Sequence, residues 1–214
     1  DFNGVIIQAT YADPTTMRSF LLNHISVPYA IPYELLTPSE QTIASTQFRK
    51  FKSNFLRINP ADPGKTFLFD IAHKHAFVHN LRMSAKLAKR SGLSGLFLDN
   101  EAYYGSTFWR YTSLLVEHPG SGTFDDYRAK YYEVGLEVGK TFTEEFPTIK
   151  LILAISFEQL RGVTEDKLPY NKYSLLPSFL NGLYDGMGDY AQIVNSLEDG
   201  YANKVMGDLD YDLK

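Results

Sequence analysis

Five short apolar runs, separated by amphipathic stretches, give this chain its pattern. The runs start near residues 4, 54, 95, 150 and 191 and are rich in aliphatic and β-branched residues, which is typical of buried strands. Between them, apolar residues recur every three or four positions, as they do on one face of a helix. A strand–helix unit repeated about five times predicts an α/β protein with a parallel sheet and right-handed crossovers. We expect a single domain over residues 1–214.

Capping signals predict where several helices begin. Asp13-Pro14 matches a helix start, with aspartate as the N-cap and proline in the first turn. Thr37 and Glu40 have the spacing of a capping box, which predicts a helix that runs to about Lys52. A last helix is expected from about residue 174 to residue 187.

Two longer helices have clear signals at both ends. Asp70 is expected to cap a helix from about Ile71 to Arg90, with Gly92 as its C-terminal stop. Thr123 opens the second helix, along which the apolar residues step by three and four, and Pro147 ends it.

Each expected strand ends in polar residues. These are Gln8 and Thr10; Arg57 and Asn59; Asp99 and Glu101; Ser156 and Glu158; Ser196 and Glu198. Polar groups at the carboxyl ends of parallel strands are typical of a (β/α) barrel of TIM type. The alternative is an open flavodoxin-like sheet, but the sequence has neither a G-x-G-x-x-G nor a G-x-x-x-x-G-K-[ST] phosphate loop. We therefore expect a barrel. A complete barrel of this type has eight strands and only five are visible here. We therefore expect a partial barrel, either a piece of a larger barrel or a barrel with three strands in stretches that look like loops.

The run from Gly95 to Tyr104 carries the strongest candidate chemistry. As a strand it places Asp99 and Glu101 on one face, roughly 6–7 Å apart at Cα. Ligands of α/β proteins bind beyond the carboxyl ends of parallel strands, so this Asp-x-Glu predicts a functional site. The alternative is that both carboxylates cap the next helix or pair with lysine or arginine. Arg57, in a neighbouring strand, needs such a partner if it is buried.

Three histidines suggest a second kind of site. His75 and His79 are spaced i, i+4 on the expected helix, and His73 is close to them. Together with Asp99 and Glu101 they raise the alternative of a metal-dependent hydrolase, with calcium or magnesium suited to the carboxylates. The sequence has no H-E-x-x-H pattern, and we expect a solvated helix edge and no metal or other cofactor.

Composition restricts the function classes. The net charge of −4 argues against nucleic acid as a partner, because phosphate-binding surfaces are usually basic. No run of eighteen apolar residues predicts a membrane span, and the absence of cysteine excludes thiolate catalysis. The chain begins at Asp1, so we expect it to be mature, processed or truncated; its compartment stays open, with a secreted or periplasmic one favoured. Aromatic residues make up 14% of the chain, and the 15 tyrosines suit either stacking against sugars or packing in the core.

Three segments resemble a known group of proteins. Phe2-Asn3-Gly4-Val5-Ile6, Asn54 to Asn59 and Gly95 to Tyr103 resemble strands of little-characterised bacterial proteins that look like (β/α)₈ glycoside hydrolases. A later strand of that group ends in an Asp-Gly-x-Glu-like segment, to which residues 195–201 are similar, although Asn195-Ser196 replaces the leading Asp-Gly. The resemblance implies that the chain begins at the second barrel strand, with the first and the last two strands absent or elsewhere.

Glycoside hydrolysis commonly needs two carboxyl groups that flank the scissile bond, and the expected positions of the acids at the strand ends suggest which residues supply them. We expect Glu101 to be the general acid, Asp99 an ionised orienting residue beside Arg57, and Glu198 the nucleophile or base, with Glu158 in reserve. The residues expected to bind the carbohydrate are Arg57, Asn59, Tyr103, Tyr104, Trp109, Glu158 and Tyr201. The aromatic members of this set could equally belong to the core. The alternative function is a non-catalytic carbohydrate-binding or structural protein, and an oligomer or a completing chain is compatible with either function.

Overall fold

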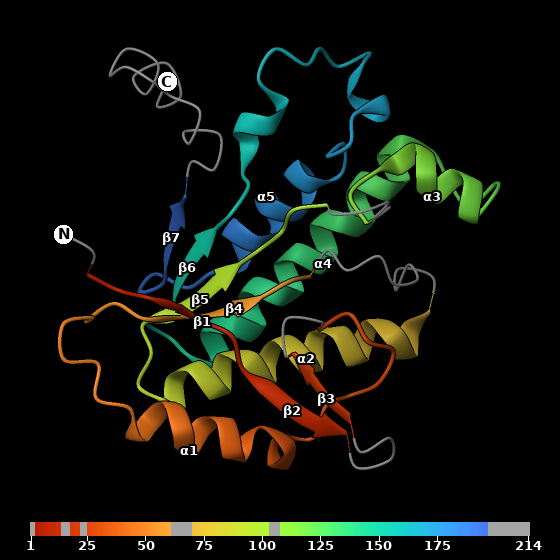
Figure 1. The fold of residues 1–214 in the computed structure, drawn as a ribbon. Coiled ribbons are helices and arrows are strands. Elements are labelled where there is room, and N and C mark those ends of the chain that lie inside the picture. The colour runs from red at the N-terminus through yellow and green to blue at the C-terminus, as the bar shows by residue number, and fades with distance from the viewer. Residues whose placement is uncertain (1–2, 14–17, 22–24, 61–69, 103–107, 197–214) are drawn as a thin grey trace.

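Five parallel strands form one sheet in the computed structural model, which describes residues 3–13, 18–21, 25–60, 70–102 and 108–196 (Figure 1). The strands are β1 (Ile6–Ile7), β4 (Phe55–Ile58), β5 (Gly95–Leu98), β6 (Lys150–Leu153) and β7 (Gln192–Asn195). Their order across the sheet is their order along the chain, and every pairing is parallel. The expected parallel α/β sheet is thus confirmed, and its order has no reversal of the kind found in open flavodoxin-like sheets.

The two faces of the sheet differ in exposure. Right-handed crossovers between successive neighbours place the connecting helices on one face, and Figure 1 shows α2, α4 and α5 there. On the three central strands, the residues of that face are at most 1% exposed: Leu56, Ile58, Leu96, Leu98, Leu151 and Leu153. On the opposite face, Ile6 and Val194 of the two outer strands are 49% and 48% exposed. The sheet is therefore covered on one side and partly open on the other, as in part of a barrel wall.

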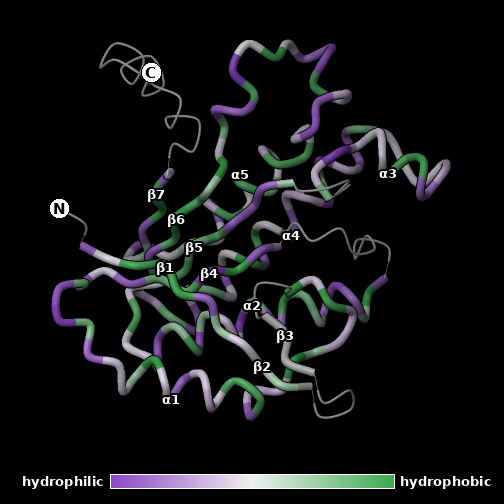
Figure 2. Tube along the Cα trace, in the orientation of Figure 1, coloured by the Kyte–Doolittle hydropathy of each residue, from purple (hydrophilic) through white to green (hydrophobic). Residues whose placement is uncertain are grey.

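Three long helices connect the strands. They are α2 (Ile71–Arg90), α4 (Phe124–Glu145) and α5 (Leu176–Gly186). The side chain of Asp70 accepts a hydrogen bond from the amide of His73, and Thr123 forms a capping box with Asp126, so both expected helix starts are confirmed. Along α2, hydrophobic and hydrophilic residues alternate (Figure 2), as expected for a helix with one face in the core. Shorter helical segments are α3 (Tyr111–Glu117), η3 (Phe157–Leu160) and η4 (Leu168–Tyr170).

The helix expected after Asp13 is wrong. Instead, β2 (Thr10–Asp13) and β3 (Arg18–Leu21) form an antiparallel pair outside the main sheet. The register of this pair sets Asp13 opposite Arg18 and Thr10 opposite Leu21. Asp13, which resembled an N-cap, is therefore the last residue of a strand. Tyr11 of the same strand is 2% exposed and belongs to the core.

The capping box expected at Thr37 is also wrong. A 3-10 turn, η1 (Tyr33–Leu36), runs directly into α1 (Thr37–Ser45), so Thr37 is the first helical residue and not its cap. The carboxylate of Glu40 turns away from the backbone and accepts hydrogen bonds from Tyr33 Oη at 2.5 Å and Arg90 Nε at 3.0 Å. The helix ends at Ser45, before the expected Lys52, where Thr46 adopts an extended backbone.

The contact between Tyr33 and Glu40 predicts how stability changes at high pH. Partial burial, followed by the hydrogen bond to Glu40, raises the pKa of Tyr33 well above its ordinary value of about 10. Above that pH the unfolded chain loses the phenolic proton while the native chain keeps it, so the free energy of unfolding falls as pH rises. In Tyr33→Phe we expect the free energy of unfolding to fall less steeply above about pH 10. The difference in slope should correspond to the release of up to about one proton fewer on unfolding. Urea unfolding from pH 8 to pH 11 measures this, and equal slopes in the two proteins would contradict the assignment.

The helices α4 and α5 pack closely because glycines line their contact. A Cβ at Gly135 would lie 2.0 Å from the carbonyl oxygen of Phe179, and one at Gly182 would lie 2.0 Å from the carbonyl oxygen of Tyr132. Gly139 and Gly186 continue the same contact one turn further on. Both helices thus carry a G-x-x-x-G pattern that allows their backbones to touch.

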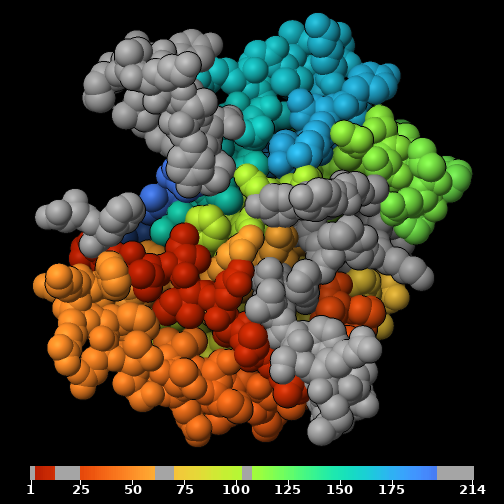
Figure 3. Space-filling model, in the orientation of Figure 1, coloured from red at the N-terminus to blue at the C-terminus, as the bar shows by residue number. Residues whose placement is uncertain are grey.

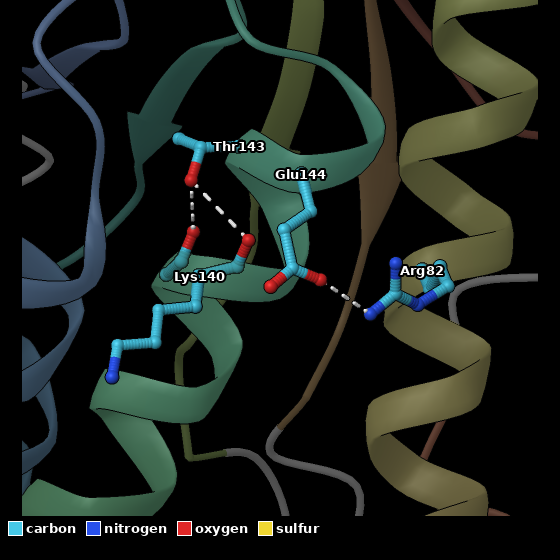
Figure 4. Close-up of polar contacts among 5 residues, drawn as sticks. Arg82, Lys140, Thr143 and Glu144 are labelled. Carbon is cyan, nitrogen blue, oxygen red and sulfur yellow. Dashed lines mark hydrogen bonds and ion pairs between the residues drawn. The ribbon is translucent and has the colours of Figure 1, made fainter.

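The contact between α2 and α4 is more polar. Figure 4 shows Arg82 of α2 with its guanidinium directed at Glu144 of α4, 2.9 Å away. Lys74 and Glu137 form a second ion pair between the same helices, at 2.8 Å. Because these side chains are between about a third and two thirds exposed, such pairs add little to stability. In the part of the chain that the structure describes, no helix has the length and hydrophobicity needed to cross a membrane.

Candidate functional site

An ion pair between β4 and the end of β5 forms the centre of the candidate site. Arg57 of β4 donates to Asp99 Oδ2 from Nε at 2.8 Å and also from a terminal guanidinium nitrogen. Asp99 is 2% exposed, and its amide donates to the carbonyl of Ile58 at 2.9 Å, so it lies where the β4–β5 ladder ends. The expected partnership of Arg57 with a carboxylate is therefore present in the structure. A buried carboxylate held in this way keeps a fixed position at the carboxyl end of the sheet.

Glu101 lies two residues beyond Asp99 in a different environment. It is partly exposed, and none of the ion pairs among the described residues involves it. The peptide groups on both sides of Glu101 are fixed: Trp109 Nε1 donates to the carbonyl of Asn100 at 2.8 Å, and the amide of Ala102 donates to Tyr173 Oη at 3.3 Å. The two carboxylates of the Asp-x-Glu thus differ in burial and in charge partner.

Asn100, between these two acids, is a structural residue that the sequence analysis did not single out. Its side chain is fully buried and bonds the backbone of Ile155 twice, donating to the carbonyl at 2.7 Å and accepting from the amide at 2.9 Å. It therefore extends the β5–β6 contact past the last ladder bond. A signal was present, because Asn100 alternates with Leu96 and Leu98 on the buried face, where an amide must find partners.

Glu158 lies beyond the end of β6. Its carboxylate accepts a hydrogen bond from the amide of Ser156 at 2.7 Å and another from Asn195 Nδ2 at 3.0 Å, which links the ends of β6 and β7. Close by, partial burial raises the pKa of Tyr184; a hydrogen bond with Ser156 opposes this shift, and the charge of Glu158 adds to it. A further carboxylate thus lies beyond the end of β6, the strand next to β5, and is already engaged by two donors.

The expected sugar-binding residues have different fates. Asn59 is buried at the end of β4, next to the strand that carries Asp99. Trp109 is fully buried in an aromatic cluster with Phe108, Tyr131 and Phe179, at centroid distances of 4.5, 5.9 and 5.2 Å. An indole without an exposed face cannot stack on a sugar, so Trp109 belongs to the core. Tyr103, Tyr104 and Tyr201 lie outside the described residues, and so does Glu198, the expected nucleophile or base.

Two histidines of α2 bond the backbone of the segment 25–31. His73 is buried with Nε2 2.6 Å from the carbonyl oxygen of Ser26, and His79 Nε2 lies 3.1 Å from that of Ile31. Asn80, fully buried on the same helix, bonds the backbone of residues 25, 29 and 31. Of the three histidines only His75 is exposed, so the expected solvated edge holds for that residue alone. No three His, Asp or Glu side chains of the described segments lie close enough to hold a metal ion.

A groove of about 630 Å³ lies between α1 and residues 7–12, which we call the N-terminal segment; neither Asp99 nor Glu101 lines it. It is lined by Ile7 and Tyr11 on one side and by Pro38, Ile43 and Phe48 on the other. In Figure 3 the N-terminal segment (red) lies against α1 (orange). The groove is mostly apolar and carries no pair of carboxylates, so we do not assign the candidate chemistry to it.

Comparisons of the chain with protein-family models, with curated proteins and with solved structures found no match. The class that can be stated is therefore the one the fold defines, an α/β protein with a five-stranded parallel sheet in sequential order.

Proposed function

We propose that this protein is a glycoside hydrolase-like enzyme built on part of a (β/α) barrel of TIM type. The proposal rests chiefly on the Arg57–Asp99 ion pair at the carboxyl ends of β4 and β5, with Glu101 two residues beyond it. The sequential, all-parallel strand order and the polar residues at the carboxyl ends of β5, β6 and β7 support the barrel. A carbohydrate is the proposed ligand, bound beyond these strand ends.

In the proposed reaction Glu101 is the general acid, which protonates the glycosidic oxygen as the bond to the leaving group breaks. Asp99 stays charged beside Arg57 and orients the substrate or Glu101. Glu198 is the proposed nucleophile or base, and Glu158, which bonds Ser156 and Asn195, is the alternative to it. What supports separate roles for Asp99 and Glu101 is their geometry, since Asp99 is buried and bonded to Arg57 whereas Glu101 is partly exposed.

Glu101→Gln tests the proposal. The glutamine amide cannot donate a proton as the carboxylic acid does, so we expect kcat on a natural glycoside to fall by about 10²-fold or more. On a 2,4-dinitrophenyl glycoside the loss should be much smaller, because that leaving group departs without protonation. Hydrolysis is measured on a panel of aryl glycosides and polysaccharides, with Tm recorded for each variant.

The matched control is Glu165→Gln, the same substitution at an exposed glutamate in the loop after β6. It should leave both kcat values and Tm unchanged. Equal losses for Glu101→Gln on both kinds of leaving group would exclude the general-acid role. Sugar binding without turnover by the native chain would overturn catalysis and favour the binding protein.

A further inference from the structure

Glu101 lies just past the end of the sheet, where the strand ladder no longer fixes the backbone. The strand β5 ends at Leu98, and the last ladder bonds in this region involve the amide of Asp99 and the carbonyl of Leu98. Glu101 itself is in neither a helix nor a strand. Its backbone angles must therefore be set by other contacts.

The direction of a side chain follows from the two peptide planes that meet at its Cα, because those planes define φ and ψ. For Glu101 these are the Asn100–Glu101 and Glu101–Ala102 peptide groups. The first is held through its carbonyl oxygen by the indole of Trp109, and the second through its amide by the hydroxyl of Tyr173. An aromatic side chain from a later loop thus anchors each of the two planes.

Both anchors are themselves fixed. The carbonyl of Trp109 accepts hydrogen bonds from the amide of Leu175 at 3.0 Å and from the hydroxyl of Ser174 at 3.2 Å, which ties the loop after β5 to the loop after β6. Tyr173 is 6% exposed, and its own amide donates to Asn171 Oδ1 at 2.7 Å. Tyr173 is therefore held by burial and by its own amide as well as by the bond of its hydroxyl to Ala102.

We propose that Tyr173 is a positioning residue for Glu101, acting with Trp109 as a clamp on the two peptide planes that flank the carboxylate-bearing residue. This inference rests on the function proposed above for Glu101. It assigns to Tyr173 no contact with substrate. Its role is to keep the carboxyl group aimed at one point. A small misplacement of a catalytic group lowers the reaction rate much more than it weakens substrate binding.

Tyr173→Phe tests the clamp, because it removes the hydroxyl and keeps the ring. We expect amide exchange at Ala102, followed by NMR, to accelerate at least about 10-fold, since that amide loses its acceptor. On the best glycoside substrate we expect kcat to fall about 10-fold with KM changed less than about twofold, the pattern of a lost transition-state alignment.

Tyr127→Phe is the matched control. It also removes a buried tyrosine hydroxyl, one that forms a hydrogen bond with Ser121 Oγ, outside the clamp of Trp109 and Tyr173. It should leave exchange at Ala102 and kcat close to those of the native chain. Unchanged exchange at Ala102 in Tyr173→Phe would overturn the clamp even if the native chain proves inactive. Faster exchange with unchanged kcat would overturn the positioning role, and an inactive native chain would overturn the proposed function alone.

Discussion

Gly135→Ala is expected to destabilise the protein by about 3 kcal/mol, although alanine is the better helix former by about 1 kcal/mol. The added methyl would lie 2.0 Å from the carbonyl oxygen of Phe179 and 2.9 Å from the amide of Leu183. Both are backbone atoms of α5, which cannot rotate away as a side chain would. To restore ordinary contact at 3.4 Å, α4 and α5 must separate by about 1.4 Å. The tight packing along the two helices is then lost.

Chemical unfolding of three variants measures this effect. Gly182→Ala should be as destabilising as Gly135→Ala, because its Cβ would meet the carbonyl of Tyr132 at the same distance. Gly188→Ala is the control, since a methyl there would meet only Thr143, at 3.6 Å or more. A Gly135→Ala variant as stable as the native chain would mean that the two helices are further apart than described.

Asn100→Ala is expected to cost a similar amount, about 3 kcal/mol. Truncation removes both partners of the Ile155 backbone, whose amide and carbonyl are buried and would be left unpaired. The bond from Trp109 should survive, because it is made to the carbonyl of Asn100 and not to the side chain. The loss is therefore one of hydrogen bonding between β5 and β6, with little change of packing elsewhere.

Two further variants separate hydrogen bonding from volume. Asn100→Asp keeps the shape but loses the donor to Ile155 and buries a charge, so it should be at least as destabilising as alanine. Asn181→Ala, at an exposed position of α5, should change the free energy of unfolding by less than about 0.5 kcal/mol. Stability of Asn100→Asp equal to that of the native chain would show that the amide bridge contributes nothing.

The parallel sheet could be predicted because each strand carries its own signal. Short apolar runs such as those at β4, β5 and β6 fit a buried strand better than a helix or a loop. The caps at Asp70 and Thr123 indicated where two of the helices between these strands begin. The N-terminal third was predicted less well, because its signals are ambiguous locally. An aspartate followed by proline suits a strand end as well as a helix start, and only the pairing of β2 with β3 decides between them.

For the candidate site, the sequence revealed charges but not contacts between distant segments. Arg57 and Asp99 could be linked because adjacent parallel strands bring their carboxyl ends together. The burial of Trp109 could not be foreseen, since it depends on Tyr131 and Phe179 from two other helices. The glycines of α4 and α5 were missed for a similar reason: a small residue in a helix is informative only once its partner helix is known.

The sequential strand order also has a consequence for synthesis on the ribosome. Paired strands are separated by only 40 to 55 residues, as in Phe55 with Gly95 and Gly95 with Lys150. No pairing within the described sheet joins its first strand to its last. At about 5–20 residues per second, each strand therefore emerges on the order of ten seconds or less after the one it pairs with. The sheet can grow in the direction of translation, one strand at a time, without waiting for the C-terminus.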